Sequence, residues 1–159
     1  MSFLFWVSMV LSVMLLAAGV WFIGQPIAAA RRRRRFEEAR DLFRCQREQL
    51  EAKFFDLAGN SGKPRGLHWL DTEFGDAVSY ARDRNNGRLS AFVAITIRFE
   101  AIEGGDMEEV EAVGNLKAAT AVFHFIPREM RWVTEGRSIF NLNPFEAIRH
   151  FRSDLDRVG

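Results

Sequence analysis

An apolar run without a single charged residue opens the polarity pattern at residues 3–23, FLFWVSMVLSVMLLAAGVWFI. A helix of these 21 residues would be about 31 Å long at about 1.5 Å per residue, which matches the hydrocarbon thickness of a bilayer. Trp6 and Trp21 lie near its two ends, and tryptophan is enriched at membrane–water interfaces. The run therefore predicts a transmembrane helix, and Pro26 just after it predicts a break or kink.

A second pattern, an apolar stripe on an otherwise polar helix, covers residues 36–58. The stripe consists of Phe36, Phe43, Leu50 and Leu57 at intervals of seven, widened by Ala39 and Phe54. An amphipathic helix of this kind packs on the domain's own sheet or pairs with another copy of the chain. We expect it to pack on the sheet, because about three heptads are short for a coiled coil.

Alternation with a period of two begins after Gly66 and predicts strands. Residues 67–74 form the first of them, and residues 76–102 a hairpin whose Asn86-Gly87 pair suits a two-residue turn, with Tyr80 opposite Val93. One face of the second arm is apolar and comprises Leu89, Ala91, Val93, Ile95, Ile97 and Phe99. The opposite face should be wetter and carries Ser90, Thr96, Arg98 and Glu100.

The remaining pattern predicts a second hairpin, a last short strand and a helix. The hairpin joins residues 116–126 to 131–136, and the last strand covers residues 137–142. Asn143 and Glu146 form a capping box around Pro144, and apolar positions predict that the helix continues to Leu155.

The predicted fold class is α+β. It consists of an N-terminal transmembrane helix, an amphipathic helix, an antiparallel sheet of about five strands and a short C-terminal helix. We divide the chain into a transmembrane anchor at residues 1–30, a polybasic juxtamembrane segment with the amphipathic helix at 31–58, and a small α+β domain at 59–159 packed with that helix.

The net charge of +1 conceals a strong asymmetry. No charged residue precedes Arg31, where five arginines follow one another: Arg31, Arg32, Arg33, Arg34 and Arg35. Without these five, the 22 basic residues of the chain fall to 17, against 21 acidic residues. The rest of the chain is therefore mildly acidic, unlike a domain that reads nucleic acid, which spreads Lys and Arg over one face.

The position of the arginines predicts the orientation of the anchor. Cytoplasmic flanks of transmembrane helices carry the excess of Lys and Arg, so we expect a single-pass protein of the cell inner membrane, with its N-terminus outside and its C-terminal domain in the cytoplasm. Trp6, Trp21 and the five arginines are the predicted membrane-interface residues, and the lipid bilayer is the first expected partner. Specific lipid recognition and binding of nucleic acid are the alternatives, and nucleic acid is not expected. Cleavage as a signal peptide is not expected either, since no positive segment precedes the apolar run.

The chain carries few candidates for chemistry. Cys45 is the only cysteine, so neither an internal disulfide nor a four-cysteine zinc site can form. His68, His124 and His150 stand apart from any second ligand at metal spacing. The acidic residues between Glu100 and Glu111 lack the spacing of an EF-hand. We expect no cofactor, no metal site and no catalytic residues.

Three segments resemble a family of bacterial proteins. GKPRGLHW, FEAIEGGDMEEVEAVGNLKAATAVF and SIFNLNPFEAI are similar to segments of an uncharacterised bacterial family of small single-pass membrane proteins. The resemblance covers about residues 45–150. It implies a location in a bacterial inner membrane and brings no known activity, cofactor or site residue.

These observations favour a membrane-anchored cytoplasmic module that binds another protein or organises a membrane complex. Its contact surface is expected on the helix at 36–58, through which the chain can also self-associate, or on the acidic loop at 100–111. The alternative is a small-molecule-binding or enzymatic α+β domain with a pocket beside the sheet that uses His124 or His68. A third hypothesis is electrostatic binding of nucleic acid or anionic lipid by the five arginines.

Overall fold

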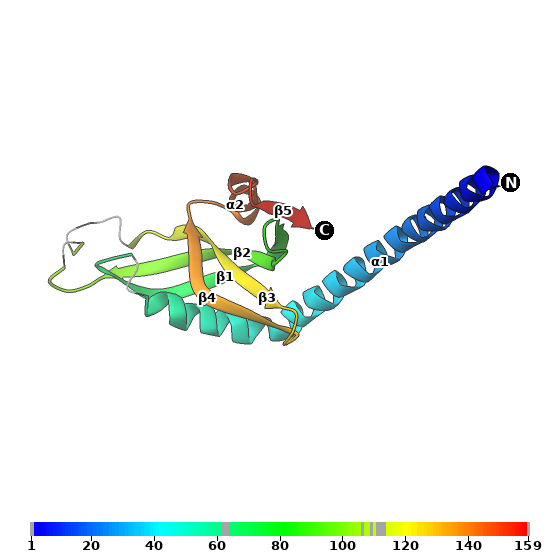
Figure 1. Cartoon of the computed structure of the whole chain (residues 1–159). Helices are drawn as coiled ribbons and strands as arrows, with labels where there is room; N and C mark the ends of the chain where they lie inside the picture. The colour runs from blue at the N-terminus through cyan, green and yellow to red at the C-terminus, as the bar shows by residue number, and fades with distance from the viewer. Residues whose placement is uncertain (1, 62–63, 106, 109, 111–113, 159) are drawn as a thin grey trace. The chain divides into compact units, whose positions relative to one another are not determined.

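A computed structural model describes residues 2–61, 64–105, 107–108, 110 and 114–158. Figure 1 shows its elements in chain order: α1 (Ser2–Gly59), β1 (Leu67–Asp83), β2 (Leu89–Ala101), β3 (Lys117–Ile126), β4 (Arg131–Phe140), α2 (Pro144–His150) and β5 (Leu155–Val158). The predicted α+β class with a five-stranded antiparallel sheet is confirmed. By its contacts the chain divides into unit 1, Met1–Asp41, and unit 2, Leu42–Gly159.

Unit 1 contains the first part of α1. The predicted break is wrong, because α1 runs through Pro26 without interruption. A proline removes one backbone hydrogen bond, and the neighbouring turns retain theirs.

The predicted transmembrane anchor falls in the same unit. Within the residues that the structure describes, no helix is both long enough and apolar enough to span a membrane. The side chains at positions 2–5 and 17–24, Trp21 among them, lie outside the described residues. The anchor at residues 3–23 falls partly on these positions and stays a prediction.

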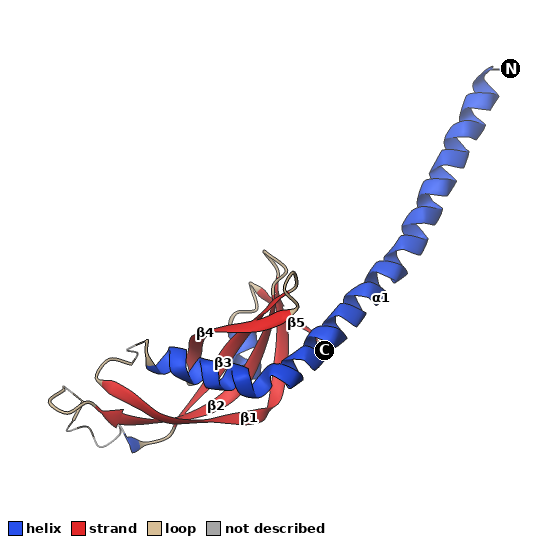
Figure 2. Cartoon of the chain, turned by 90° about the horizontal axis from the view of Figure 1, so that it is seen from below, coloured by secondary structure: helices blue, strands red, loops and turns tan. Residues whose placement is uncertain are grey.

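Unit 2 is built around the sheet, whose strand order is β4-β3-β2-β1-β5. The part of α1 that belongs to unit 2 lies across one face of the sheet (Figure 2). The residues of β2 that were predicted to share a face are all buried, from Leu89 to Phe99. The periodicity of two therefore identified the core side of this strand correctly.

Aromatic side chains join α1 to the sheet. The Phe43 ring lies edge-on to Phe123 at 5.4 Å and to Trp132 at 5.0 Å, measured between ring centroids. Phe54 lies 5.8 Å from Phe123 and 5.7 Å from Phe74. Pairs of this kind contribute about 0.5–1.5 kcal/mol each beyond the burial of their surface. The Phe43, Leu50 and Phe54 side chains of the predicted stripe are thus covered by unit 2.

A smaller core lies on the opposite face, under α2. It contains Ala81, Phe92 and Val122 from the sheet and Ala147 and Ile148 from α2. The predicted capping box is confirmed at the start of α2. There Glu146 N donates to Asn143 Oδ1 at 2.9 Å, and Asn143 N donates to Glu146 Oε2 at 3.1 Å.

The turn between β1 and β2 differs from the prediction. Tyr80 lies opposite Ala91 instead of Val93, a shift of two positions. The Asp83 carboxylate accepts hydrogen bonds from the backbone N–H groups of Asn85 and Asn86, which stabilises a longer turn than Asn-Gly alone requires. Because the shift is even, every side chain keeps its predicted face.

Strand boundaries were also predicted incorrectly. The first strand does not end at Phe74 but continues to Asp83 across a register shift between Phe74 and Val78. Residues 131–136 and 137–142 are not separate strands, because β4 continues through Gly136. The last helix ends at His150, and Leu155–Val158 forms β5 beside β1. Each difference depends on a partner strand that is distant in the sequence.

The end of α1 shows how tightly it packs on β4. Leu57, predicted in the stripe, is exposed, and Ala58 is buried instead. A helix drifts by about 20° per heptad relative to a repeat of seven, so a stripe predicted at that interval leaves the covered face after three heptads. At this point a side chain at Gly136 would lie 2.7 Å from Ala58 N, so only glycine fits.

Candidate functional site

The predicted membrane-interface residues lie in unit 1. Trp6 and all five arginines are exposed side chains of α1, whereas the side chain of Trp21 lies outside the described residues. Arg33 Nε donates to Glu37 Oε1 at 3.2 Å, one helical turn later. The structure thus places the arginines on one continuous helical segment.

The five arginines are not equivalent, since three of them surround a hollow. Ile27, Ala28, Arg31, Arg32 and Arg35 line an open hollow of about 400 Å³ on the helix surface. Because Arg31 and Arg35 are four residues apart, their side chains neighbour each other along the helix. No motif in the sequence marks this subset, but helical spacing identifies it once the segment is known to be helical.

The predicted contact surface on the helix at 36–58 is largely buried. Phe43, Leu50 and Phe54 are covered within unit 2, so another molecule can reach this part of α1 only through its polar faces. One such face is engaged as well. The guanidinium group of Arg47 donates to Gly75 O at 2.6 Å and to Asp76 O at 3.0 Å, and its Nε donates to Glu51 Oε1.

The acidic loop lies partly outside the described residues, which do not include positions 106, 109 and 111–113. Glu100, Glu103 and Glu108 are exposed, and Glu108 Oε2 accepts a hydrogen bond from Gly104 N at 2.9 Å. No group of three or more potential ligands that could hold a metal ion is found in the part of the chain that the structure describes.

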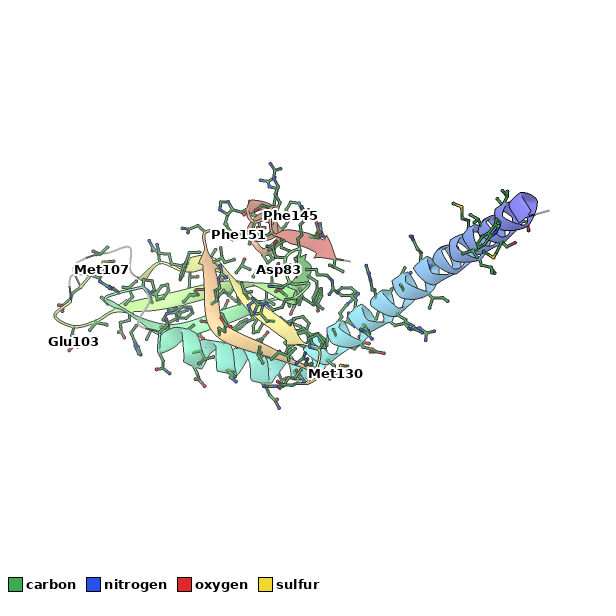
Figure 3. All side chains as sticks on the ribbon, viewed as in Figure 1. Asp83, Glu103, Met107, Met130, Phe145 and Phe151 are labelled. Atoms are coloured by element: carbon green, nitrogen blue, oxygen red, sulfur yellow. The ribbon has the colours of Figure 1, made fainter. Side chains whose placement is uncertain are left out.

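Three exposed apolar side chains, Leu70, Ile102 and Leu116, lie at the same end of the sheet as this loop. We call them the distal patch. The register places them near the same edge of the sheet: Ile102 N donates to Gly66 O at 3.0 Å, Asp71, which follows Leu70, lies opposite Arg98, and Lys117, which follows Leu116, lies opposite Ile97. Figure 3 shows Glu103 and Met107 at this end of the sheet and Met130 at the other. Sequence reasoning identified the acidic residues here but not their apolar neighbours.

His124 and Phe123 are adjacent in β3 and therefore project to opposite faces of the sheet. Its Nδ1 lies 2.9 Å from Ser90 Oγ, and both side chains are buried. Burial lowers the pKa of His124 below its ordinary 6.5; Arg88 lowers this pKa further, Glu135 raises it and Arg137 lowers it. The face was expected to be wet at Ser90, so the burial of this pair is a correction. The two polar groups satisfy each other by a hydrogen bond between neighbouring strands, which offsets the cost of their burial.

The other candidates for chemistry do not meet His124. His68 is exposed on β1, and His150 lines a second hollow of about 250 Å³ with Asn141, Leu142, Glu146 and Arg149. Neither this hollow nor the one beside the arginines is lined by His124 or His68. In a nucleophilic pair the base must take the proton of an accessible hydroxyl, whereas the Ser90 hydroxyl is buried. The geometry of the Ser90–His124 pair is therefore that of a buried structural hydrogen bond.

Comparison with known proteins adds no relative: no family model, no curated protein and no solved structure matches the chain.

Proposed function

We propose that the chain is a single-pass membrane protein whose unit 2 is a cytoplasmic module for binding another protein. The observation that carries the proposal is the charge asymmetry around the apolar run. Residues 1–30 contain no charged side chain, and five arginines follow directly. A bilayer-spanning helix with this flank is retained with the arginines on the cytoplasmic side. The resemblance to small single-pass membrane proteins of bacteria supports an inner-membrane location.

The orientation can be tested by moving the charge. In the native chain, a reporter active only in the cytoplasm should be active when fused after residue 159, and one active only outside should be inactive. Replacing the five arginines by glutamine and adding five arginines before Phe3 should reverse both results, because the Lys and Arg bias sets the orientation. Activity of the outside reporter in the native chain would refute the orientation, and recovery of the native chain without membranes would refute the anchor.

The distal patch is the surface of unit 2 that best fits a protein partner. It combines exposed apolar side chains with the exposed carboxylates of Glu100 and Glu103. The fully buried centre of a protein interface is more apolar than the rest of the surface, and its rim is polar. The expected partner therefore presents an apolar centre with a basic rim.

Site-specific photocrosslinking in intact cells tests this surface. A photoreactive residue at Leu70 or Leu116 should give a discrete crosslinked product, and one at Phe145, equally exposed but on α2, should not. The affinity of the native complex should also fall in 0.5 M salt, because salt screens the attraction between exposed charges at the rim. Equal crosslinking from all three positions, or none from the patch, would contradict the assignment of the surface.

A further inference from the structure

Three arginines gather around one hollow on the helix, and the orientation of the anchor does not require this arrangement. Topology depends on the number of positive charges near the membrane and not on which face of the helix carries them. In the structure Arg31, Arg32 and Arg35 line one hollow, while Arg33 and Arg34 do not. Positive charge is thus more concentrated on this face of the segment than it would be if the five charges were spread evenly around the helix.

Acidic residues follow the arginines along the helix. Glu37 lies four residues after Arg33 and pairs with it at 3.2 Å. Glu38 lies four residues after Arg34. The residues four positions after Arg32 and Arg35 are Phe36 and Ala39 instead. Side chains three or four residues apart are neighbours on a helix, so Glu37 and Glu38 neighbour Arg33, Arg34 and Arg35, and no carboxylate has this spacing from Arg31 or Arg32.

No ion pair joins Arg31, Arg32 or Arg35 to any carboxylate of the described residues. Like charges four residues apart on a helix repel each other, so Arg31 and Arg35 destabilise the segment unless an anion lies between them. Guanidinium groups bind phosphate oxygens through pairs of parallel hydrogen bonds. An anion with several oxygens is therefore the ligand that this face selects.

The other wall of the hollow defines the rest of the ligand. Ile27 and Ala28 lie one turn before Arg31 and Arg32, on the side of the apolar run. A ligand that fills the hollow meets apolar side chains at one end and guanidinium groups at the other. This order, apolar and then anionic, is that of a phospholipid read from its acyl chains to its phosphate.

We propose that Arg31, Arg32 and Arg35 bind the phosphate of an anionic phospholipid, whose glycerol and first acyl carbons lie on Ile27 and Ala28. The site rests on the proposed function, since it needs residues 3–23 in a bilayer. The lipid neutralises the mutual repulsion of the three arginines and holds α1 at a fixed depth. Arg33 and Arg34 contribute to orientation but not to this site.

Two charge-matched variants of the full chain test the site. Arg32→Gln with Arg35→Gln removes two charges from the hollow, and Arg33→Gln with Arg34→Gln removes two charges outside it. Each protein is reconstituted in phosphatidylcholine vesicles containing spin-labelled phosphatidylglycerol, and the fraction of motionally restricted label gives its association relative to labelled phosphatidylcholine. The preference for phosphatidylglycerol should fall about tenfold in the first variant and about twofold in the second, because charge-assisted hydrogen bonds add to the general attraction of each arginine.

Equal losses in the two variants would overturn the site and leave the anchor intact, since net charge alone would then explain the preference. Flotation of the same vesicles on a density gradient separates the two proposals: a native chain that does not float with lipid refutes the anchor and the site together. Excess duplex DNA should leave the preference of the native chain unchanged. A preference that DNA abolishes would assign these arginines to nucleic-acid phosphate instead.

Discussion

At the scale of single residues, the environment of a side chain decides more than its type. The chain has three histidines, and only His124 is buried, with Ser90 as its hydrogen-bond partner. A buried imidazole favours the neutral form, because burial penalises charge. The nearby guanidinium groups of Arg88 and Arg137 act in the same direction, against Glu135.

The lowered pKa of His124 predicts how stability depends on pH. The unfolded chain has the ordinary pKa of 6.5 at this residue and the folded chain a lower one. Below pH 6.5 the unfolded state therefore binds more protons, and the free energy of unfolding decreases as the pH falls towards the folded pKa. In His124→Gln this loss should disappear, and in Arg88→Gln it should shrink because the folded pKa rises.

Thermal unfolding of the full chain in mild detergent, followed by near-ultraviolet circular dichroism, measures this effect. The decrease in melting temperature between about pH 7.5 and about pH 5.5, which brackets the ordinary histidine pKa, is compared among the native chain and the two variants. A decrease in His124→Gln as large as in the native chain would show that other groups cause it.

At the scale of elements, close packing of α1 on the sheet determines the shape of unit 2. Arg47 binds two carbonyl groups at the irregular part of β1, and Trp132 N donates to Gln46 Oε1 at 3.1 Å. Side chains of the helix thereby hydrogen-bond to backbone groups of β1 and β4. Gly136 lets β4 pass the end of the helix in backbone contact, with a φ of 69°.

Substitution of Gly136 by alanine should strongly destabilise unit 2. The new methyl group would lie 2.7 Å from Ala58 N and 2.8 Å from Leu57 C, which are backbone atoms that cannot rotate away. Crowding of this kind costs about 1–3 kcal/mol, and the positive φ adds about 1–2 kcal/mol. Denaturation of the full chain by urea should show a loss of about 2–5 kcal/mol in the free energy of unfolding.

Gly87→Ala is the matched control for this prediction. Gly87 also has a positive φ, of 70°, but a methyl group there would meet nothing within 4 Å. The free energy of unfolding should therefore fall only by the cost of the positive φ, about 1–2 kcal/mol. Similar losses at both positions would mean that the contact between α1 and β4 does not limit stability.

At the scale of the whole molecule, the division into two units predicts which part of the chain folds independently. A chain of residues 36–159 contains all of unit 2 and should unfold cooperatively with a near-ultraviolet signal from its packed aromatic rings. A chain of residues 59–159 lacks Phe43, Leu50 and Phe54. Burying three such side chains contributes on the order of 6 kcal/mol, a large part of the roughly 5–15 kcal/mol that stabilises a domain.

Circular dichroism of the two shortened chains distinguishes these states. The longer chain should show a sharp thermal transition, and the shorter one should show no transition and a weak near-ultraviolet signal. A sharp transition in the shorter chain would demonstrate that the sheet is stable without α1, contrary to the role of the aromatic core described above.

Local patterns in the sequence were sufficient for much of this protein. The period of two placed the residues of β2 on their correct faces, and the Asn143–Glu146 capping box formed as predicted. The same reasoning identified the run of five arginines. It also identified the acidic residues of the loop that lies at the distal end of the sheet. These features depend on neighbours within about one helical turn or one strand, so a linear sequence contains the information.

Other features were decided only by contacts between distant residues. The pairing of β5 with β1 and the burial of His124 beside Ser90 both require partners far along the chain. The distal patch likewise combines Leu70 of β1 with Ile102, just after β2, and Leu116, just before β3. By itself, the sequence determined the α+β class, the apolar face of β2, the capping box and the asymmetry of charge, because these follow from local periodicity and spacing. The tertiary structure decided which strand lies beside which, because that depends on three-dimensional proximity that no local pattern encodes.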